Sequence, residues 1–302
     1  MINGDKGYGY MLRFGIYFGY WQHDYNADFK YYIKKYSKLG FEVLEVDPVV
    51  IANLSMKERK ELKQYADYYG TYLTYGVGFP PEMDMAAKDE KLQKAAIEFA
   101  IKIINTIASI GGKELPGIIH SAWNPIMEID LISDKRPYIE RSLKSMKKVV
   151  KALEDNGIIY SIETLNRYEH YMLNTIAETI SYIDQLGSPN VKILADVFHL
   201  NIEEENMIES IIKAGKYIGY VHLGENNRNL PGTGIMDWDS IAQALKNIDY
   251  KGCIVLEPFV LTGGPIGRDL RIWHNLINDA SEASLDQHAL KAMEFVRSKF
   301  RW

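Results

Sequence analysis

Residues 191–196 have the sequence VKILAD, an apolar run that closes on a carboxylate. Three more runs in the second half of the chain have the same form: GIIYSIE at 157–163, YIGYVH at 217–222 and CIVLE at 253–257. Runs of this kind lack helical spacing and are typical of strands buried on both faces of a parallel sheet. The polar residues that close them are Glu163, Asp196, His222 and Glu257.

The spacing of these four residues predicts where their side chains meet. They are separated by 33, 26 and 35 positions, and each interval fits one strand–helix–strand unit of about 30 residues. Because the carboxyl ends of parallel strands form one rim of a barrel, we expect the four side chains to converge there. Any one of them alone would be explained as a polar residue at a strand end. Four in series predict a divalent metal site, since buried carboxylates need a cation or hydrogen bonds to compensate them.

Strand and helix patterns alternate along the whole chain. The clearest helical patterns cover 89–110 and 137–155, and a last one near 284–299 is expected to pack outside the barrel. Eight alternations without a Pro- or Ser-rich linker predict an α/β fold, a single-domain (β/α)8 TIM barrel over 13–302 that follows an N-terminal extension at 1–12. A doubly wound open sheet is the structural alternative. The predicted strands are 13–18, 41–46, 71–77, 115–120, 158–163, 191–196, 218–223 and 253–257.

Composition narrows the function classes. Apolar residues make up 47% of the 302 positions and the formal net charge is −5, so a large core is expected and a broad basic field is absent. We therefore expect no nucleic-acid partner and no anionic membrane partner. The only cysteine, Cys253, cannot form an intrachain disulfide, which fits a reducing compartment. With no signal-like or membrane-spanning apolar stretch, the expected location is cytoplasmic.

Several segments resemble the ketose 3-epimerases, the D-tagatose and D-psicose (D-allulose) 3-epimerase group within the xylose-isomerase-like barrels. The resemblance extends from about residue 13 to the C-terminus, and its most specific part is the ordered set of four predicted ligands with polar companions three and six residues away. The segments that carry it are FGIYFGYW at 14–21, SIETLNRYE at 161–169, DVFHLNIEEEN at 196–206, HLGENNR at 222–228 and LEPFV at 256–260.

The resemblance implies a role for individual residues. It implies that the four strand-end residues hold one Mn²⁺ or Co²⁺ ion and that the protein is a homodimer or homotetramer. Three polar residues are implied to hold the reacting end of the sugar, namely Glu169, His199 and Arg228. Three aromatic residues are expected to line the pocket, namely Tyr17, Trp21 and Trp123. Taken singly, these six would be explained as core aromatics or as loop and surface polar groups.

The ligand set also predicts the chemistry without the resemblance. Oxygen ligands with one imidazole favour Mn²⁺, Mg²⁺ or Co²⁺, although zinc stays possible. If Glu163 and Glu257 lie on opposite sides of a bound ketose, one can remove the proton from carbon 3 and the other can return it on the opposite face. The metal would chelate oxygens 2 and 3 and stabilise the cis-enediolate between these steps. The predicted activity is a metal-dependent 3-epimerase of free ketoses.

Other functions remain as alternatives. A metal-dependent aldose–ketose isomerase would use a similar site to move hydrogen between carbons 1 and 2. A DNA-repair endonuclease on a related barrel would need several zinc ions, a basic face and more than the seven histidines present. A non-catalytic sugar-binding barrel would not need both glutamates. No Arg and Lys cluster follows the last two strands, so a free ketose is expected rather than a sugar phosphate, with D-psicose/D-fructose and D-tagatose/D-sorbose both open as substrate pairs.

Overall fold

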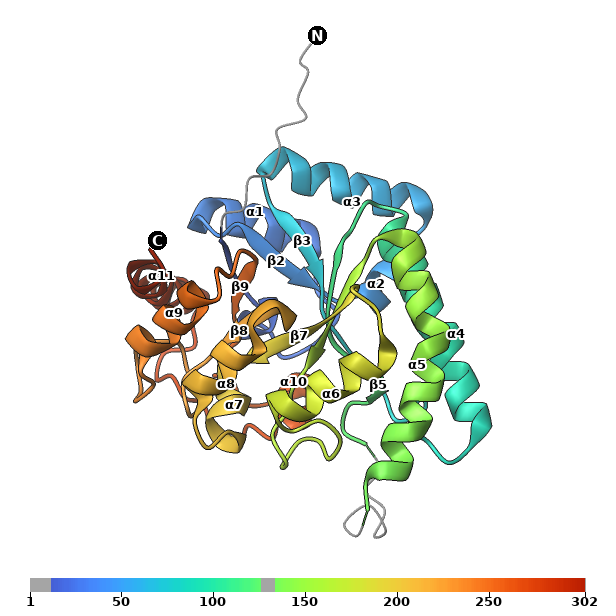
Figure 1. The fold of residues 1–302 in the computed structure, drawn as a ribbon. Coiled ribbons are helices and arrows are strands. Elements are labelled where there is room, and N and C mark those ends of the chain that lie inside the picture. The colour runs from blue at the N-terminus through green and yellow to red at the C-terminus, as the bar shows by residue number, and fades with distance from the viewer. Residues whose placement is uncertain (1–11, 126–133, 302) are drawn as a thin grey trace.

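Nine parallel strands form one sheet that curves into a nearly closed barrel, with helices around it (Figure 1). The computed structural model describes residues 12–125 and 134–301, so the predicted N-terminal extension lies, apart from Leu12, outside the described residues. The strand order is β3-β2-β1-β9-β8-β7-β6-β5-β4. The predicted single-domain TIM barrel is confirmed. The strands are β1 (Arg13–Ile16), β2 (Val43–Val46), β3 (Tyr72–Tyr75), β4 (Val77–Phe79), β5 (Glu114–Ala122), β6 (Ile159–Glu163), β7 (Val191–Asp196), β8 (Ile218–Leu223) and β9 (Cys253–Leu256).

The third predicted strand, 71–77, is divided at Gly76 into β3 and β4. β3 pairs with β2, whereas β4 pairs with β5, so the division is the point at which the sheet changes partners. A Cβ atom added to Gly76 would lie 2.1 Å from Oε1 of Glu45, and only glycine leaves room for this carboxylate. The expectation of eight continuous strands is wrong at this position.

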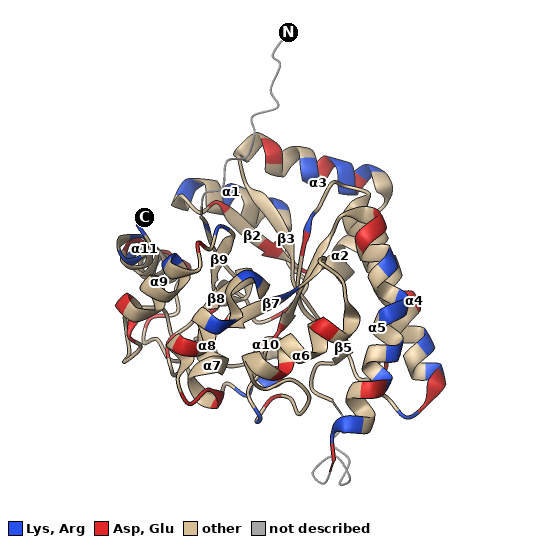
Figure 2. Cartoon of the chain, in the orientation of Figure 1, with Lys and Arg blue, Asp and Glu red and all other residues tan. Residues whose placement is uncertain are grey.

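The helices surround the barrel and bury one apolar face each against the strands. Positively and negatively charged residues are interspersed along α3, α4 and α5 (Figure 2). The predicted helix near 284–299 is present as α11, outside the barrel. The long helices are α1 (Phe29–Leu39), α3 (Met56–Tyr69), α4 (Glu90–Ala108), α5 (Arg136–Asn156), α6 (Ile176–Leu186), α8 (Met207–Ala214), α9 (Trp238–Asn247) and α11 (Glu282–Lys299).

All of the shorter helices but η3, which precedes β8, lie in loops after strands, on the side of the candidate site. Asp47 caps the first turn of α2 and Asp196 caps that of α7, each by accepting a backbone N–H. The short elements are η1 (Phe18–Trp21), α2 (Pro48–Asn53), α7 (Val197–Glu203), η3 (Gly215–Tyr217) and α10 (Gly264–Asp269). Within the described ranges, no helix is both long enough and apolar enough to cross a membrane.

Glu114 gives the fold a pH dependence that can be measured. Burial raises the pKa of Glu114 to about 7, and the charge of Arg13 lowers it only in part. Because the folded carboxyl keeps a proton that an unfolded Glu loses near pH 4.5, its contribution to stability is complete below that pH and is lost as the pH rises through about 7. We predict that Glu114→Gln gains about 2–3 kcal/mol of unfolding free energy relative to wild type between pH 5 and pH 8. Urea unfolding at both pH values tests this, and a difference that does not change with pH would contradict it.

Candidate metal centre

The four predicted strand-end residues meet in space. They lie at the carboxyl ends of four neighbouring strands of the sheet, β6 to β9, and one ligand atom of each lies within 4.8 Å of the others. All four side chains are buried. The predicted convergence is therefore present, and the cluster can hold a metal ion. Its members are Glu163, Asp196, His222 and Glu257.

The donor atoms of this cluster fit a divalent cation. Nδ1 of His222 is buried and has no hydrogen-bond partner among the described residues, yet it lies 3.3 Å from Oε2 of Glu257 and 4.0 Å from Oε1 of Glu163. A buried nitrogen without a partner is costly, and a lone pair that faces carboxylate oxygens suits a shared cation. Three carboxylates and one imidazole are the set that suits Mn²⁺, Co²⁺ or Mg²⁺.

Glu45, which the sequence analysis missed, contacts the other nitrogen of His222. Its Oε2 lies 3.1 Å from Nε2 of His222, and its side chain is buried. When Nε2 donates to Glu45, Nδ1 keeps its lone pair toward the cluster, which is the tautomer that a metal requires. Tyr220, whose hydroxyl lies 2.8 Å from Thr74 Oγ1, also hydrogen-bonds Glu45. The detectable signal was an acidic residue inside the apolar run FEVLEV.

The two glutamates of the cluster differ in electrostatic environment. Burial raises the pKa of Glu163, and repulsion from Glu257 raises it further. The hydrogen bond and the charge of His199 lower this pKa but do not cancel the rise. Burial also acts on Glu257, but when no metal is bound a protonated His222 and the Arg228 guanidinium outweigh it and lower the pKa of Glu257 to about 2. Two carboxylates with different proton affinities in one site are a common arrangement in acid–base catalysis.

The three residues expected to hold the sugar lie beside the cluster. Arg228 Nη2 donates to Glu257 Oε2 over 2.8 Å, and its Nη1 donates to Asp196. Nη2 of Arg228 also lies 3.3 Å from Nε2 of His199. Oε1 of Glu169 lies 3.9 Å from Nδ1 of His199. Glu169, His199 and Arg228 thus form one polar group at the edge of the cluster.

The loop after β8 holds Arg228 in place. Arg228 has a left-handed backbone, with φ of 65°, which is uncommon for a side chain of this size. Glu225 is fully buried beneath this loop and accepts hydrogen bonds from Gly232 N at 2.7 Å and Trp238 Nε1 at 2.8 Å. The loop is therefore anchored from inside, and the Arg228 guanidinium is held against the cluster.

A cavity of about 510 Å³ opens over the cluster. This volume lies in the range of small-molecule sites. Tyr17 and Trp123 line it, as predicted, and so do three residues that sequence reasoning missed: Tyr25, Asp47 and Phe259.

Within the described ranges, Trp21 is not among the residues that line the cavity, and its pocket role stays a prediction. It belongs to η1, whose side chains are buried against α1 and α11. Its indole Nε1 donates to Asp286 over 2.8 Å, and its ring packs 5.9 Å from that of Tyr36. Tyr25, four residues further along the loop, reaches the cavity instead.

Comparisons with known proteins agree with this architecture. The family model described as xylose isomerase-like TIM barrel matches residues 33–284. The chain is 38% identical to D-psicose 3-epimerase of Enterocloster bolteae over 96% of both chains. It is 36% identical to D-psicose 3-epimerase of Agrobacterium fabrum, over 95% of this chain and 98% of the other. The crystal structure of D-psicose 3-epimerase with D-tagatose from Clostridium cellulolyticum H10 is similar with a TM-score of 0.92 and 36% identity, covering 96% of this chain and all of that one.

The contact between Glu45 and His222 predicts a specific loss of metal affinity. Glu45→Gln keeps the size of the side chain and an acceptor oxygen but removes the charge that favours the required tautomer. We predict that the variant binds Mn²⁺ about tenfold more weakly than wild type. Isothermal titration of the metal-free protein measures this directly. Glu114→Gln, which changes a partly buried carboxyl at the opposite end of the barrel, is the matched control and should bind Mn²⁺ normally. Equal affinities for wild type and Glu45→Gln would refute the prediction.

Proposed function

The chain belongs to the xylose isomerase-like TIM barrels and, within them, to the ketose 3-epimerases, and from this we propose that it inverts carbon 3 of free ketoses with the help of a divalent metal ion. The observation that carries the proposal is the buried cluster in which two glutamates, one from β6 and one from the end of β9, place a carboxylate oxygen each within 4.8 Å of the other. The relatives act on D-psicose by name, and a similar structure contains D-tagatose.

The proposed ligands are Glu163, Asp196, His222 and Glu257. Mn²⁺ or Co²⁺ is the proposed ion, with Mg²⁺ as a further possibility. When bound, such an ion supplies Lewis-acid stabilisation of the negative charge that develops on oxygens 2 and 3 of the sugar.

The two glutamates carry the proton transfers. One carboxylate accepts the proton from carbon 3, and the electron pair of that C–H bond is delocalised over carbons 2 and 3 as an enediolate. The other carboxylic acid returns a proton to carbon 3 from the opposite face, which inverts its configuration. For the reverse substrate the roles of Glu163 and Glu257 exchange.

The surrounding residues orient the sugar. In this proposal Glu169, His199 and Arg228 hold the oxygens of carbons 1 to 3, since all three line the cavity beside the glutamates. Tyr17, Phe259 and Trp123 cover the reacting carbons with apolar surface and limit the access of water. Both D-psicose/D-fructose and D-tagatose/D-sorbose are proposed substrate pairs, and a homodimer or homotetramer is the proposed assembly.

Removal of the metal tests the first requirement. We predict that a protein stripped by chelator loses epimerase activity and regains it on addition of Mn²⁺ or Co²⁺, because the negative charge on the sugar oxygens is otherwise uncompensated. Product formation from D-fructose is followed by chromatography, and metal content is checked by elemental analysis. Full activity in a sample verified as free of metal would rule out this part of the proposal.

Isotope exchange separates epimerisation from the isomerase alternative. In heavy water the epimer should gain deuterium at carbon 3 and none at carbon 1, because the proton passes through a carboxylate that exchanges with solvent. Glu163→Gln and Glu257→Gln keep the side-chain size but remove the proton acceptor, so each should lose about 10²-fold or more in kcat. Mass spectrometry and NMR locate the label. A product labelled at carbon 1 or 2, or full conversion without label, would favour the isomerase.

A further inference from the structure

The cavity has a second polar wall away from the metal cluster. It consists of Tyr25, Asp47 and Asp269, and we call it the distal wall. Tyr25 lies in the loop after β1, Asp47 directly follows β2, and Asp269 ends α10 in the loop after β9. Because β2, β1 and β9 are neighbours in the sheet, the three residues border one side of the cavity. Apart from Glu257, the cluster residues belong to the other side, on β6 to β8.

The side of the cavity formed by β4 and β5 is mostly apolar. Val77, Pro80, Pro116, Ile118 and Trp123 line it and offer few side-chain hydrogen bonds. A ketose bound with carbons 1 to 3 at the cluster still carries a hydroxyl on every remaining carbon. Buried hydroxyls without partners are costly, so the far end of the sugar is best satisfied by the distal wall.

Asp47 is the best-positioned acceptor of this wall. It is the N-cap of α2, and its Oδ1 accepts from Val49 N over 2.7 Å, which fixes the side chain. A carboxylate has about four acceptor positions, so this cap leaves capacity for a ligand hydroxyl. Burial raises the pKa of Asp47 to about 6, against the backbone hydrogen bonds of Val49 and Val50, which lower it.

Tyr25 and Asp269 complete the wall as a connected pair. The hydroxyl of Tyr25 donates to Oδ2 of Asp269 over 3.3 Å, and Nε of Arg268 donates to Oδ1 over 2.6 Å. The Tyr25 oxygen can still accept a hydrogen bond from a ligand hydroxyl.

The charge of the cavity determines which far end it accepts. Among the described residues that line it, both arginines are already paired with carboxylates: Arg228 with Glu257 and Arg268 with Asp269. A phosphate dianion would be repelled by the net negative charge of the cavity, whereas a neutral hydroxyl can donate a hydrogen bond to its carboxylates. The acidic residues of the lining are Glu45, Asp47, Glu163, Glu169, Glu257 and Asp269.

We propose that Asp47, with Tyr25 and Asp269, forms a subsite that binds the hydroxyls at the far end of the ketose and selects neutral, longer-chain ketoses over ketose phosphates. The inference rests on the proposed epimerase function and deepens it, because it assigns the choice of substrate to residues that take no part in the proton transfers.

Chain length tests the subsite. D-fructose has hydroxyls on carbons 5 and 6, whereas erythrulose, a four-carbon ketose, keeps the reacting carbons but lacks this far end. Asp47→Ser retains a side chain that can cap α2 but removes the carboxylate. We predict that the ratio of kcat/KM for D-fructose to that for erythrulose falls about tenfold in this variant, the loss expected for a hydrogen bond to a charged group. Chromatography follows D-fructose, and loss of optical rotation follows erythrulose.

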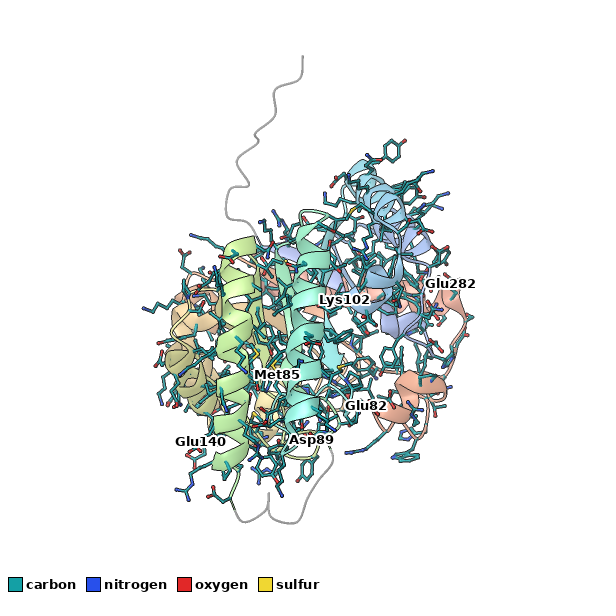
Figure 3. The ribbon with its side chains drawn as sticks, turned by 90° about the vertical axis from the view of Figure 1, so that its right-hand side faces the viewer. Glu82, Met85, Asp89, Lys102, Glu140 and Glu282 are labelled. Carbon is teal, nitrogen blue, oxygen red and sulfur yellow. The ribbon has the colours of Figure 1, made fainter. Side chains whose placement is uncertain are left out.

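A matched control separates the subsite from the cap. Asp89 is the N-cap of α4 on the outside of the barrel, where it accepts from Lys91 N over 2.8 Å (Figure 3). Asp89→Ser makes the same replacement in a cap far from the cavity and should leave the ratio unchanged. If the ratio of kcat/KM for D-fructose to that for erythrulose is unchanged in Asp47→Ser, whether both values are as in wild type or both fall equally, the proposal is overturned.

The charge of the subsite is tested separately with fructose 6-phosphate. Asp47→Asn keeps the cap and the size of the side chain but removes a negative charge. The ratio of kcat/KM for D-fructose to that for fructose 6-phosphate should therefore fall at least severalfold. An unchanged preference would overturn the selection against phosphates. If the wild-type protein epimerises neither D-fructose nor erythrulose, the proposed function itself fails and the subsite with it. If it epimerises both but the variants behave as wild type, only the subsite fails.

Discussion

Three carboxylates buried within a few ångströms of one another are the constraint on which the rest of the site depends. Without compensation, Glu163, Asp196 and Glu257 would repel one another at a cost that a fold of ordinary stability cannot carry. The protein supplies Arg228 against Asp196 and Glu257 and the His222 imidazole between Glu163 and Glu257, and the proposed metal supplies the remainder. Burial, with added repulsion from Glu257, raises the pKa of Glu163, whereas His222 and Arg228 lower that of Glu257. The stability problem and the acid–base chemistry therefore both arise from the burial of these carboxylates.

The break in the barrel wall at Gly76 belongs to the same arrangement. Glu45 can reach Nε2 of His222 only because its other oxygen occupies the space that a side chain at position 76 would fill. The change of pairing from β3 to β4 occurs at this residue. A local defect of the sheet and the orientation of His222 are therefore linked, and a larger residue at position 76 would disturb the cluster through Glu45 rather than by direct contact.

The sequence was sufficient to predict the barrel and the convergence of the four strand-end residues, since both follow from strand periodicity and from the rule that parallel strands share a rim. It was insufficient to predict which of Trp21 and Tyr25, four residues apart in one aromatic loop, reaches the cavity. A short 3₁₀ helix turns Trp21 toward Asp286 and the core. Glu45 was missed for a different reason. Whether a carboxylate in the middle of an apolar run points into the barrel can be predicted only when the register of the strand is known. The partner of Glu45, His222, lies 177 positions away in the sequence.

Strand ends and loops divide the work in this cavity. The cluster residues end strands or directly follow them, so their positions are fixed by the hydrogen bonding of the sheet, which suits atoms that must meet a reacting carbon within a fraction of an ångström. Tyr25 and Asp269 lie on loops, where a replacement alters the far end of the cavity without moving the glutamates. Asp47 lies between these cases, because it follows β2 directly and also begins α2. The choice of sugar can therefore change through a few loop positions while the proton-transfer chemistry stays fixed by the barrel.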